Sequence, residues 1–205
     1  MKLFIPGSVP PALEPRAITQ DAKASGNPTI FLIGPRCSGK STVGGLLAVN
    51  LGLAAHDTDL MVVRKAKRSI AEIVAGEGWE EFRALEAEAL IEAVAAGGVI
   101  AGGGGIVLVP ENRRLMRASG LVFYLAASLQ TLYERMSQAH NAGFRPALRG
   151  TDALSEISAV LAERKALYLE CAHHCLDADR PAEEVAREAC RLISGGSFTD
   201  FRREI

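Results

Sequence analysis

A phosphate-binding loop is the clearest chemical feature of the chain. Residues 34–41 read GPRCSGKS, in which Gly34, Gly39, Lys40 and Ser41 match the pattern G-x-x-x-x-G-K-[ST]. Glycines let the backbone curl so that successive N–H groups point at one anion, beside the positive end of the helix that follows. Lys40 adds a point charge for the outer phosphates, and the Ser41 hydroxyl suits Mg²⁺. The motif predicts binding of ATP or GTP, whereas the alternative is a glycine-rich turn.

Two carboxylates, Asp57 and Asp59, follow the second apolar run of the chain in the sequence HDTDL. In open α/β sheets, ligands bind outside the carboxyl ends of the strands. One carboxylate there can face a metal and the other an acceptor hydroxyl. The alternative is a helix N-cap beside a loop aspartate, because Asp and Thr are common capping residues. The residues alone leave both interpretations open.

Two arginines lie on or beside apolar helix faces. Arg83 borders the apolar stripe of GWEEFRALE, where an arginine is usually a surface residue whose aliphatic stem packs on the helix. Arg164 follows Leu161 by three residues, on the apolar face of LSEISAVLAERKALY. An arginine on a core-facing stripe needs a negative partner, so Arg164 indicates either an internal salt bridge or an anionic ligand.

Two loops complete the candidate site. The run AGGGGIVL follows an apolar run, and glycines at the carboxyl end of a strand let a ligand approach the backbone closely. Residues 137–151 are polar and aperiodic, which is typical of a lid or, alternatively, of a surface loop. Arg135, Arg145 and Arg149 lie in or beside this segment. An arginine delivered by a lid can stabilise charge on a transferred phosphoryl group.

The elements that position these residues alternate between strands and helices. Strands are predicted at residues 29–33, 52–57, 99–105, 121–127 and 173–178. Helices are predicted at 43–52, 69–78, 79–98, 110–118, 128–138, 152–170 and 181–193, with Gly52 as a C-cap and Ser69 with Glu72 as a capping box. This order predicts one α/β domain at 29–193, a parallel sheet with helices on both faces. Residues 1–28, which contain five prolines, and 194–205 are predicted tails.

Bulk composition argues against several classes of protein. A net charge of −1 provides no basic field for nucleic acid, and no apolar run has the length of a membrane span. The N-terminus lacks a secretory pattern and the four cysteines form no disulfide framework, so we expect a cytoplasmic protein. The sequence CAHHC at 171–175 holds metal-ligand residue types, but its spacing fits no zinc pattern. We predict that these residues are ordinary core.

Taken in order, the phosphate loop, DTD, GWEEFRALE, GGGIVLVPENR, FRPAL and LAERKALY resemble the shikimate kinase family over residues 29–193. The longer segment between Arg135 and Arg145 resembles the family's second isozyme type, known from enteric bacteria. The resemblance implies the three-layer fold of nucleoside monophosphate kinases, with a five-stranded parallel sheet and a mobile lid. It implies an enzyme of aromatic amino acid biosynthesis that uses ATP and Mg²⁺ to convert shikimate into shikimate 3-phosphate, with ADP as second product.

The resemblance also implies a role for each matching residue. ATP is expected to contact Gly34, Cys37, Ser38, Gly39, Lys40, Ser41, Thr42, Arg135 and Arg145. The metal is expected at Ser41 and Asp57. Shikimate is expected to contact Asp59, Arg83, Gly103, Gly104, Gly105 and Arg164, with the two arginines on its carboxylate. The residues implied in catalysis are Lys40, Asp59 as base for the attacking hydroxyl, and Arg145 from the lid.

Three features depart from the family pattern: Ala147 in the lid motif, Gly102 and the N-terminal tail. None removes a chemical group that the mechanism needs. Two other functions are compatible with the phosphate loop, a gluconate-type kinase and a kinase-like sensor domain of a transcriptional regulator. The first explains the two arginines only in part, and the second needs a DNA-binding module that residues 1–28 are too short to form. No long coiled-coil seam is visible, so we expect a monomer.

Overall fold

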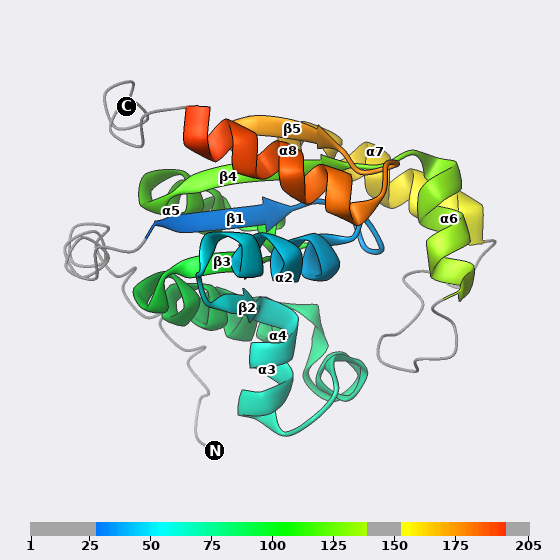
Figure 1. The fold of residues 1–205 in the computed structure, drawn as a ribbon. Helices are drawn as coiled ribbons and strands as arrows, with labels where there is room; N and C mark the ends of the chain where they lie inside the picture. The colour runs from blue at the N-terminus through cyan, green and yellow to red at the C-terminus, as the bar shows by residue number, and fades with distance from the viewer. Residues whose placement is uncertain (1–27, 139–152, 196–205) are drawn as a thin grey trace, which may run out of the picture.

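The computed structural model describes residues 28–138 and 153–195, which form a parallel sheet between two layers of helices (Figure 1). The strands are β1 (Thr29–Ile33), β2 (Ala55–Asp57), β3 (Gly98–Ala101), β4 (Leu121–Ala126) and β5 (His174–Asp177). They lie in the order β2-β3-β1-β4-β5, and every neighbouring pair is parallel. The predicted five-stranded parallel sheet is confirmed.

Alternation along the strands divides the core into two faces. In β1, Ile30 and Leu32 pack on one side of the sheet, while Phe31 and Ile33 pack on the other. Helices α2 (Lys40–Leu51) and α8 (Ala182–Gly195) cover the first face (Figure 1). Helices α4 (Ile70–Ala96), α5 (Pro110–Ser119) and α7 (Ala153–Cys171) cover the second. Because both faces are covered, the three central strands β3, β1 and β4 are apolar almost throughout, whereas the edge strands β2 and β5 also contain His and Asp.

Local capping signals define several helix ends as the sequence predicts. The Ser69 side chain accepts from the Glu72 backbone N–H, and the Glu72 carboxylate accepts from the Ser69 N–H, which completes the capping box of α4. Gly52 ends α2 in the left-handed conformation, at φ 66°. The two helices predicted at 69–78 and 79–98 are joined into α4, with a kink at Gly78 where φ is 87°.

The remaining elements are α3 (Thr58–Ala66), the short 3₁₀ helix η1 (Ile106–Leu108) and α6 (Leu129–Gln138). Helix α3 was not predicted, and it packs on α4 through Val62, Ile73 and Phe82. Among the described helices, none combines the length and hydrophobicity that a membrane span requires. Most of the predicted lid and of the two predicted tails lies outside the described residues.

Because the five strands are parallel, the segments that carry the predicted functional residues lie at one edge of the sheet. The phosphate loop follows β1, Asp57 ends β2 with Asp59 two residues later, and the glycine run 102–105 follows β3. The segment 178–181 follows β5. Since all strands point the same way, these four connections meet at the carboxyl edge, where an open α/β sheet forms its ligand crevice.

Candidate active site

The phosphate loop has the backbone that its sequence predicts. Gly34, Cys37 and Gly39 take positive φ angles of 149°, 65° and 92°. A Cβ at Gly34 would lie 2.7 Å from the Leu125 carbonyl oxygen, so the first glycine is required for space as well as for its backbone angle. The Lys40 ammonium donates to the carbonyls of Gly34 at 2.9 Å and Pro35 at 2.7 Å, and therefore lies directly over the loop.

A hydroxyl and a carboxylate meet beside this loop. Ser41 Oγ donates to Asp57 Oδ2 at 2.6 Å, while Asp57 Oδ1 accepts from the backbone N–H groups of Asp59 and Leu60. Asp57 is therefore the N-cap of α3, as the capping interpretation predicts, and its second carboxylate oxygen faces Ser41. Hydroxyl and carboxylate oxygens are the ligands that Mg²⁺ takes beside substrate phosphates, and this donor set fits the ion.

One cavity joins these groups. It has a volume of about 420 Å³ and is lined by Arg36, Cys37, Ser38, Gly39, Lys40, Ser41, Thr42, Val43, Asp57, Asp59, Gly102, Arg135, Ala178, Arg180, Ala182 and Val185. The wall thus contains most of the predicted nucleotide and metal residues together with Asp59, the predicted base. The structure places the phosphate loop and the carboxylates of the β2–α3 junction in one continuous space.

The glycine loop connects this cavity with the predicted acceptor residues. The Gly103 N–H donates to Thr58 Oγ1 at 2.9 Å, which ties the loop to the first residue of α3. A Cβ at Gly103 would lie 2.7 Å from Asp59 Oδ1 and closer still to Glu86 Oε1. Two buried carboxylates therefore flank Gly103, and a side chain at this position would displace them.

Arg83 is fixed by a carboxylate that the sequence analysis did not select. Arg83 Nη1 lies 2.5 Å from Glu86 Oε2, and the guanidinium also lies over the rings of Trp79 and Phe82. Glu86 is fully buried, and its Oε1 has no hydrogen-bond partner among the described residues. Burial raises the pKa of Glu86, although the Arg83 charge opposes that shift.

The position of Glu86 carries a sequence signal. Phe82, Glu86, Ala89 and Ala93 recur at helical spacing and are all buried. Glu86 thus lies on a core-facing stripe, as Arg164 does, and a charged residue at such a position needs a partner of opposite charge.

Arg164 and Tyr168 approach the glycine loop from α7. Arg164 Nη1 donates to the Gly104 carbonyl at 3.3 Å, and the Tyr168 hydroxyl donates to the same oxygen. Arg164 makes no ion pair with a carboxylate in the described part of the chain, and its buried Nε has no hydrogen-bond partner there. The internal salt bridge considered for Arg164 is therefore absent from these residues.

Arg83 and Arg164 approach neighbouring glycines of the same loop. A Cβ at Gly105 would overlap the Arg83 guanidinium, while Arg164 contacts Gly104.

The nucleotide side of the cavity contains the predicted Arg135 and also Arg180, which was not predicted from the sequence. Arg135 Nη2 donates to the Ala178 carbonyl at 2.9 Å, and its guanidinium lies near Gly39. Arg180 lines the same cavity and is held by ion pairs with Glu184 and Glu188. The rule that ligands bind beyond the carboxyl ends of strands, applied to β5, points to this segment. Arg145 and Ala147 lie outside the described residues.

The CAHHC segment does not form a metal site in the described residues, where no three histidine, cysteine or acidic side chains gather. His173 Nδ1 accepts from the Val122 N–H at 3.0 Å. Cys171 is buried, as predicted for ordinary core, and burial raises the pKa of its thiol to about 11. The same prediction is wrong for Cys175, which is exposed because it lies on the edge strand β5.

Comparisons with known proteins agree with this geometry. A family model described as shikimate kinase matches residues 36–194. Shikimate kinase 2 of Enterobacter sp. (strain 638) is 51% identical over 156 residues, which are 76% of this chain and 90% of the relative. Shikimate kinase of Oleidesulfovibrio alaskensis is 48% identical over 166 residues, 80% of this chain and 96% of the relative.

Solved structures give the same result. Shikimate kinase from Acinetobacter baumannii in complex with shikimate superimposes with a TM-score of 0.78 at 31% identity, covering 85% of this chain and 97% of that one. Shikimate kinase from Aquifex aeolicus has a TM-score of 0.70 at 32% identity, covering 82% of this chain and 96% of that one. The predicted P-loop kinase fold is confirmed by these neighbours.

Proposed function

The chain belongs to the shikimate kinase family, and we infer that it transfers the γ-phosphoryl group of ATP to a hydroxyl of shikimate, giving shikimate 3-phosphate and ADP. One observation carries the inference. The cavity over the phosphate loop reaches Asp59, and Asp59 lies against the glycine loop that Arg83 and Arg164 approach. Donor and acceptor sites are thus contiguous, as an in-line transfer requires.

On the donor side, we propose that the loop residues 34–42 hold the phosphates of ATP. Lys40 places a positive charge over the loop, where it can move to the outer phosphate oxygens. Ser41 and Asp57 would hold Mg²⁺, which when bound neutralises charge on the phosphate oxygens. We propose that Arg135 lies near the adenine, that Arg180 contributes to the same side, and that Arg145 acts from the lid.

On the acceptor side, Asp59 is the proposed base. It is buried beside Gly103, so its carboxylate can accept a hydrogen bond from the attacking hydroxyl and orient that oxygen toward the phosphorus. Arg83 and Arg164 are proposed to bind the substrate carboxylate by charge-assisted hydrogen bonds. The Arg164 Nε–H, which is buried and has no hydrogen-bond partner among the described residues, supports this role. Glu86 fixes the Arg83 guanidinium and keeps its fork oriented.

We further propose that the enzyme works as a monomer in the cytoplasm, in aromatic amino acid biosynthesis, with a small-molecule acceptor and neither a nucleic acid nor a membrane as partner. The net charge of −1 supports the proposal on nucleic acid. Light scattering coupled to size-exclusion chromatography tests the oligomeric state. A mass near 21.8 kDa is the expected result, and twice that mass would contradict it.

The test of the function is ADP release by the purified protein, with Mg²⁺ and ATP, in the presence and absence of shikimate. Gluconate serves as a matched acceptor control because it also carries a carboxylate and several hydroxyl groups. We expect strong stimulation by shikimate and none by gluconate. ATP binding without stimulation by shikimate would contradict the acceptor assignment and leave the phosphate-loop assignment intact.

A further inference from the structure

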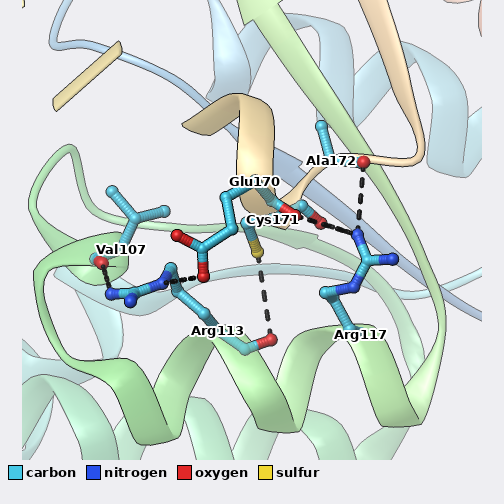
Figure 2. Close-up of polar contacts among 6 residues, drawn as sticks. All are labelled: Val107, Arg113, Arg117, Glu170, Cys171 and Ala172. Carbon is cyan, nitrogen blue, oxygen red and sulfur yellow. Dashed lines mark hydrogen bonds and ion pairs between the residues drawn. The ribbon is translucent and has the colours of Figure 1, made fainter. Parts of the chain in front are cut away.

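Helix α5 contacts two elements that flank the glycine loop, and Arg113 makes both contacts (Figure 2). Arg113 Nη1 donates to the Val107 carbonyl of η1 at 2.7 Å. Its Nε lies 3.2 Å from Glu170 Oε1 on α7. The Arg113 side chain is 15% exposed and the Glu170 side chain 61% exposed, so the contact with Val107 is the better shielded from water of the two. One guanidinium therefore joins η1 to α7.

Arg117, one turn later on α5, holds the end of α7. Its Nη1 lies 3.0 Å from the carbonyl oxygen of Glu170, 3.2 Å from that of Cys171 and 3.3 Å from that of Ala172 (Figure 2). A cation at a helix C-terminus satisfies carbonyls that have no partner within the helix and complements the helix dipole. The C-terminal turn of α7 is thereby fixed on α5.

The two elements that Arg113 joins define the acceptor side of the site. Helix η1 begins directly after Gly105, so the Val107 anchor fixes the end of the glycine loop. Helix α7 carries Arg164 and Tyr168, which both donate to the Gly104 carbonyl. The separation of η1 and α7 therefore sets where the Arg164 guanidinium lies relative to the glycine loop.

We propose that Arg113 is a positioning residue for the acceptor substrate. It joins η1 to α7 and thereby holds Arg164 against the glycine loop. The inference rests on the proposed function, because Arg164 is taken there as a carboxylate ligand. The Arg113 guanidinium is held by the Val107 carbonyl and the Glu170 carboxylate, so we take it to act through Arg164 and not by contact with substrate. Loss of Arg113 weakens acceptor binding and leaves nucleotide binding unchanged, since the side-chain hydrogen bonds given for Arg113 go to Val107 and Glu170 and not to the phosphate loop.

Arg114 provides a matched control on the same helix. Its side chain is 72% exposed and its ion pair is with Glu111 on the same helix. We compare Arg113→Gln with Arg114→Gln in steady-state ADP release, varying shikimate and ATP separately. Arg113→Gln should raise KM for shikimate about five- to twentyfold with KM for ATP within about twofold. Arg114→Gln should leave both constants unchanged, and Arg113→Lys, which has one nitrogen for two partners, should fall between them.

A double substitution separates positioning from general stability. In an Arg164→Lys background, adding Arg113→Gln should change KM for shikimate by less than about twofold, because the residue through which Arg113 acts has been altered. If the double variant instead showed the product of the two single fold-changes in KM for shikimate, the proposal would be overturned. An Arg113→Gln protein that melts at a lower temperature but keeps the KM for shikimate of the Arg114→Gln control would overturn it as well. If wild-type and control proteins show no shikimate-dependent turnover, the proposed function itself fails, and the inference fails with it.

Discussion

Replacing Gly103 by alanine should disable acceptor chemistry while leaving the fold and the nucleotide site intact. The new Cβ would lie 2.7 Å from Asp59 Oδ1, whereas ordinary contact begins at 3.4 Å. Asp59 must therefore withdraw by about 0.7 Å, and Glu86 must move as well. Misplacement of a catalytic group by about 1 Å can cost on the order of 10²-fold in rate, or about 2.7 kcal/mol of transition-state stabilisation.

The assay is steady-state ADP release with shikimate varied, and ATP affinity is measured separately by calorimetry. We expect kcat/KM for shikimate to fall about 100-fold and ATP affinity to stay within about twofold. Gly76→Ala is the matched control, because a Cβ at Gly76 meets nothing within 4 Å. That control should keep full activity and gain up to about 1 kcal/mol of stability, since alanine favours the helix. Gly103→Ala activity within threefold of this control would refute the role given to the Asp59 position.

Three further outcomes follow from polar groups that are buried or half-buried. Glu86→Gln should release Arg83 and so raise KM for shikimate about tenfold. The variant should be no less stable than the wild type at pH 7, because burial raises the pKa of Glu86 and its negative charge therefore opposes folding. A clear loss of stability with an unchanged KM would contradict this. Asp57→Asn should raise the Mg²⁺ concentration needed for half-maximal rate, as a magnesium titration would show. Burial lowers the pKa of His173, whose Nδ1 must stay unprotonated to accept from Val122. Chemical denaturation should therefore show stability falling as pH drops below about 6.5, by at most about 1.4 kcal/mol per pH unit, and less steeply in His173→Asn.

The phosphate loop and the sheet were predictable because their signals are local. Glycines at fixed spacing determine the loop, and the buried apolar strands stand out between helical patterns. Asp57 and Asp59 were placed at the crevice by the order of strands alone. For Asp57, the sequence could not decide between a helix cap and a metal ligand, because both use the same carboxylate. In the structure, Asp57 has contacts suited to both.

Helix α3 was missed because its signal depends on tertiary contact. Its residues TDLMVVRKA include three β-branched residues, and Val62 is its one fully buried aliphatic side chain. Packing on α4 supplies the stability that the local pattern lacks. Glu86 was missed for a different reason, since a glutamate in a helix usually faces water. The lid residue Arg145 stays a prediction.

The junction between β2 and α3 places three consecutive side chains against two loops of the site. Asp57 contacts Ser41, Thr58 holds the Gly103 N–H, and Asp59 lies against the glycine loop from the side of the cavity. Asp57 is the extended N-cap residue, and Thr58 and Asp59 in the first turn of α3 point about 100° apart, so all three side chains meet their partners in only one register. An inserted or deleted residue here would rotate all three groups away from their partners at once. In a redesigned version of this chain, we therefore expect a change of length to be tolerated less well at this junction than in an exposed loop.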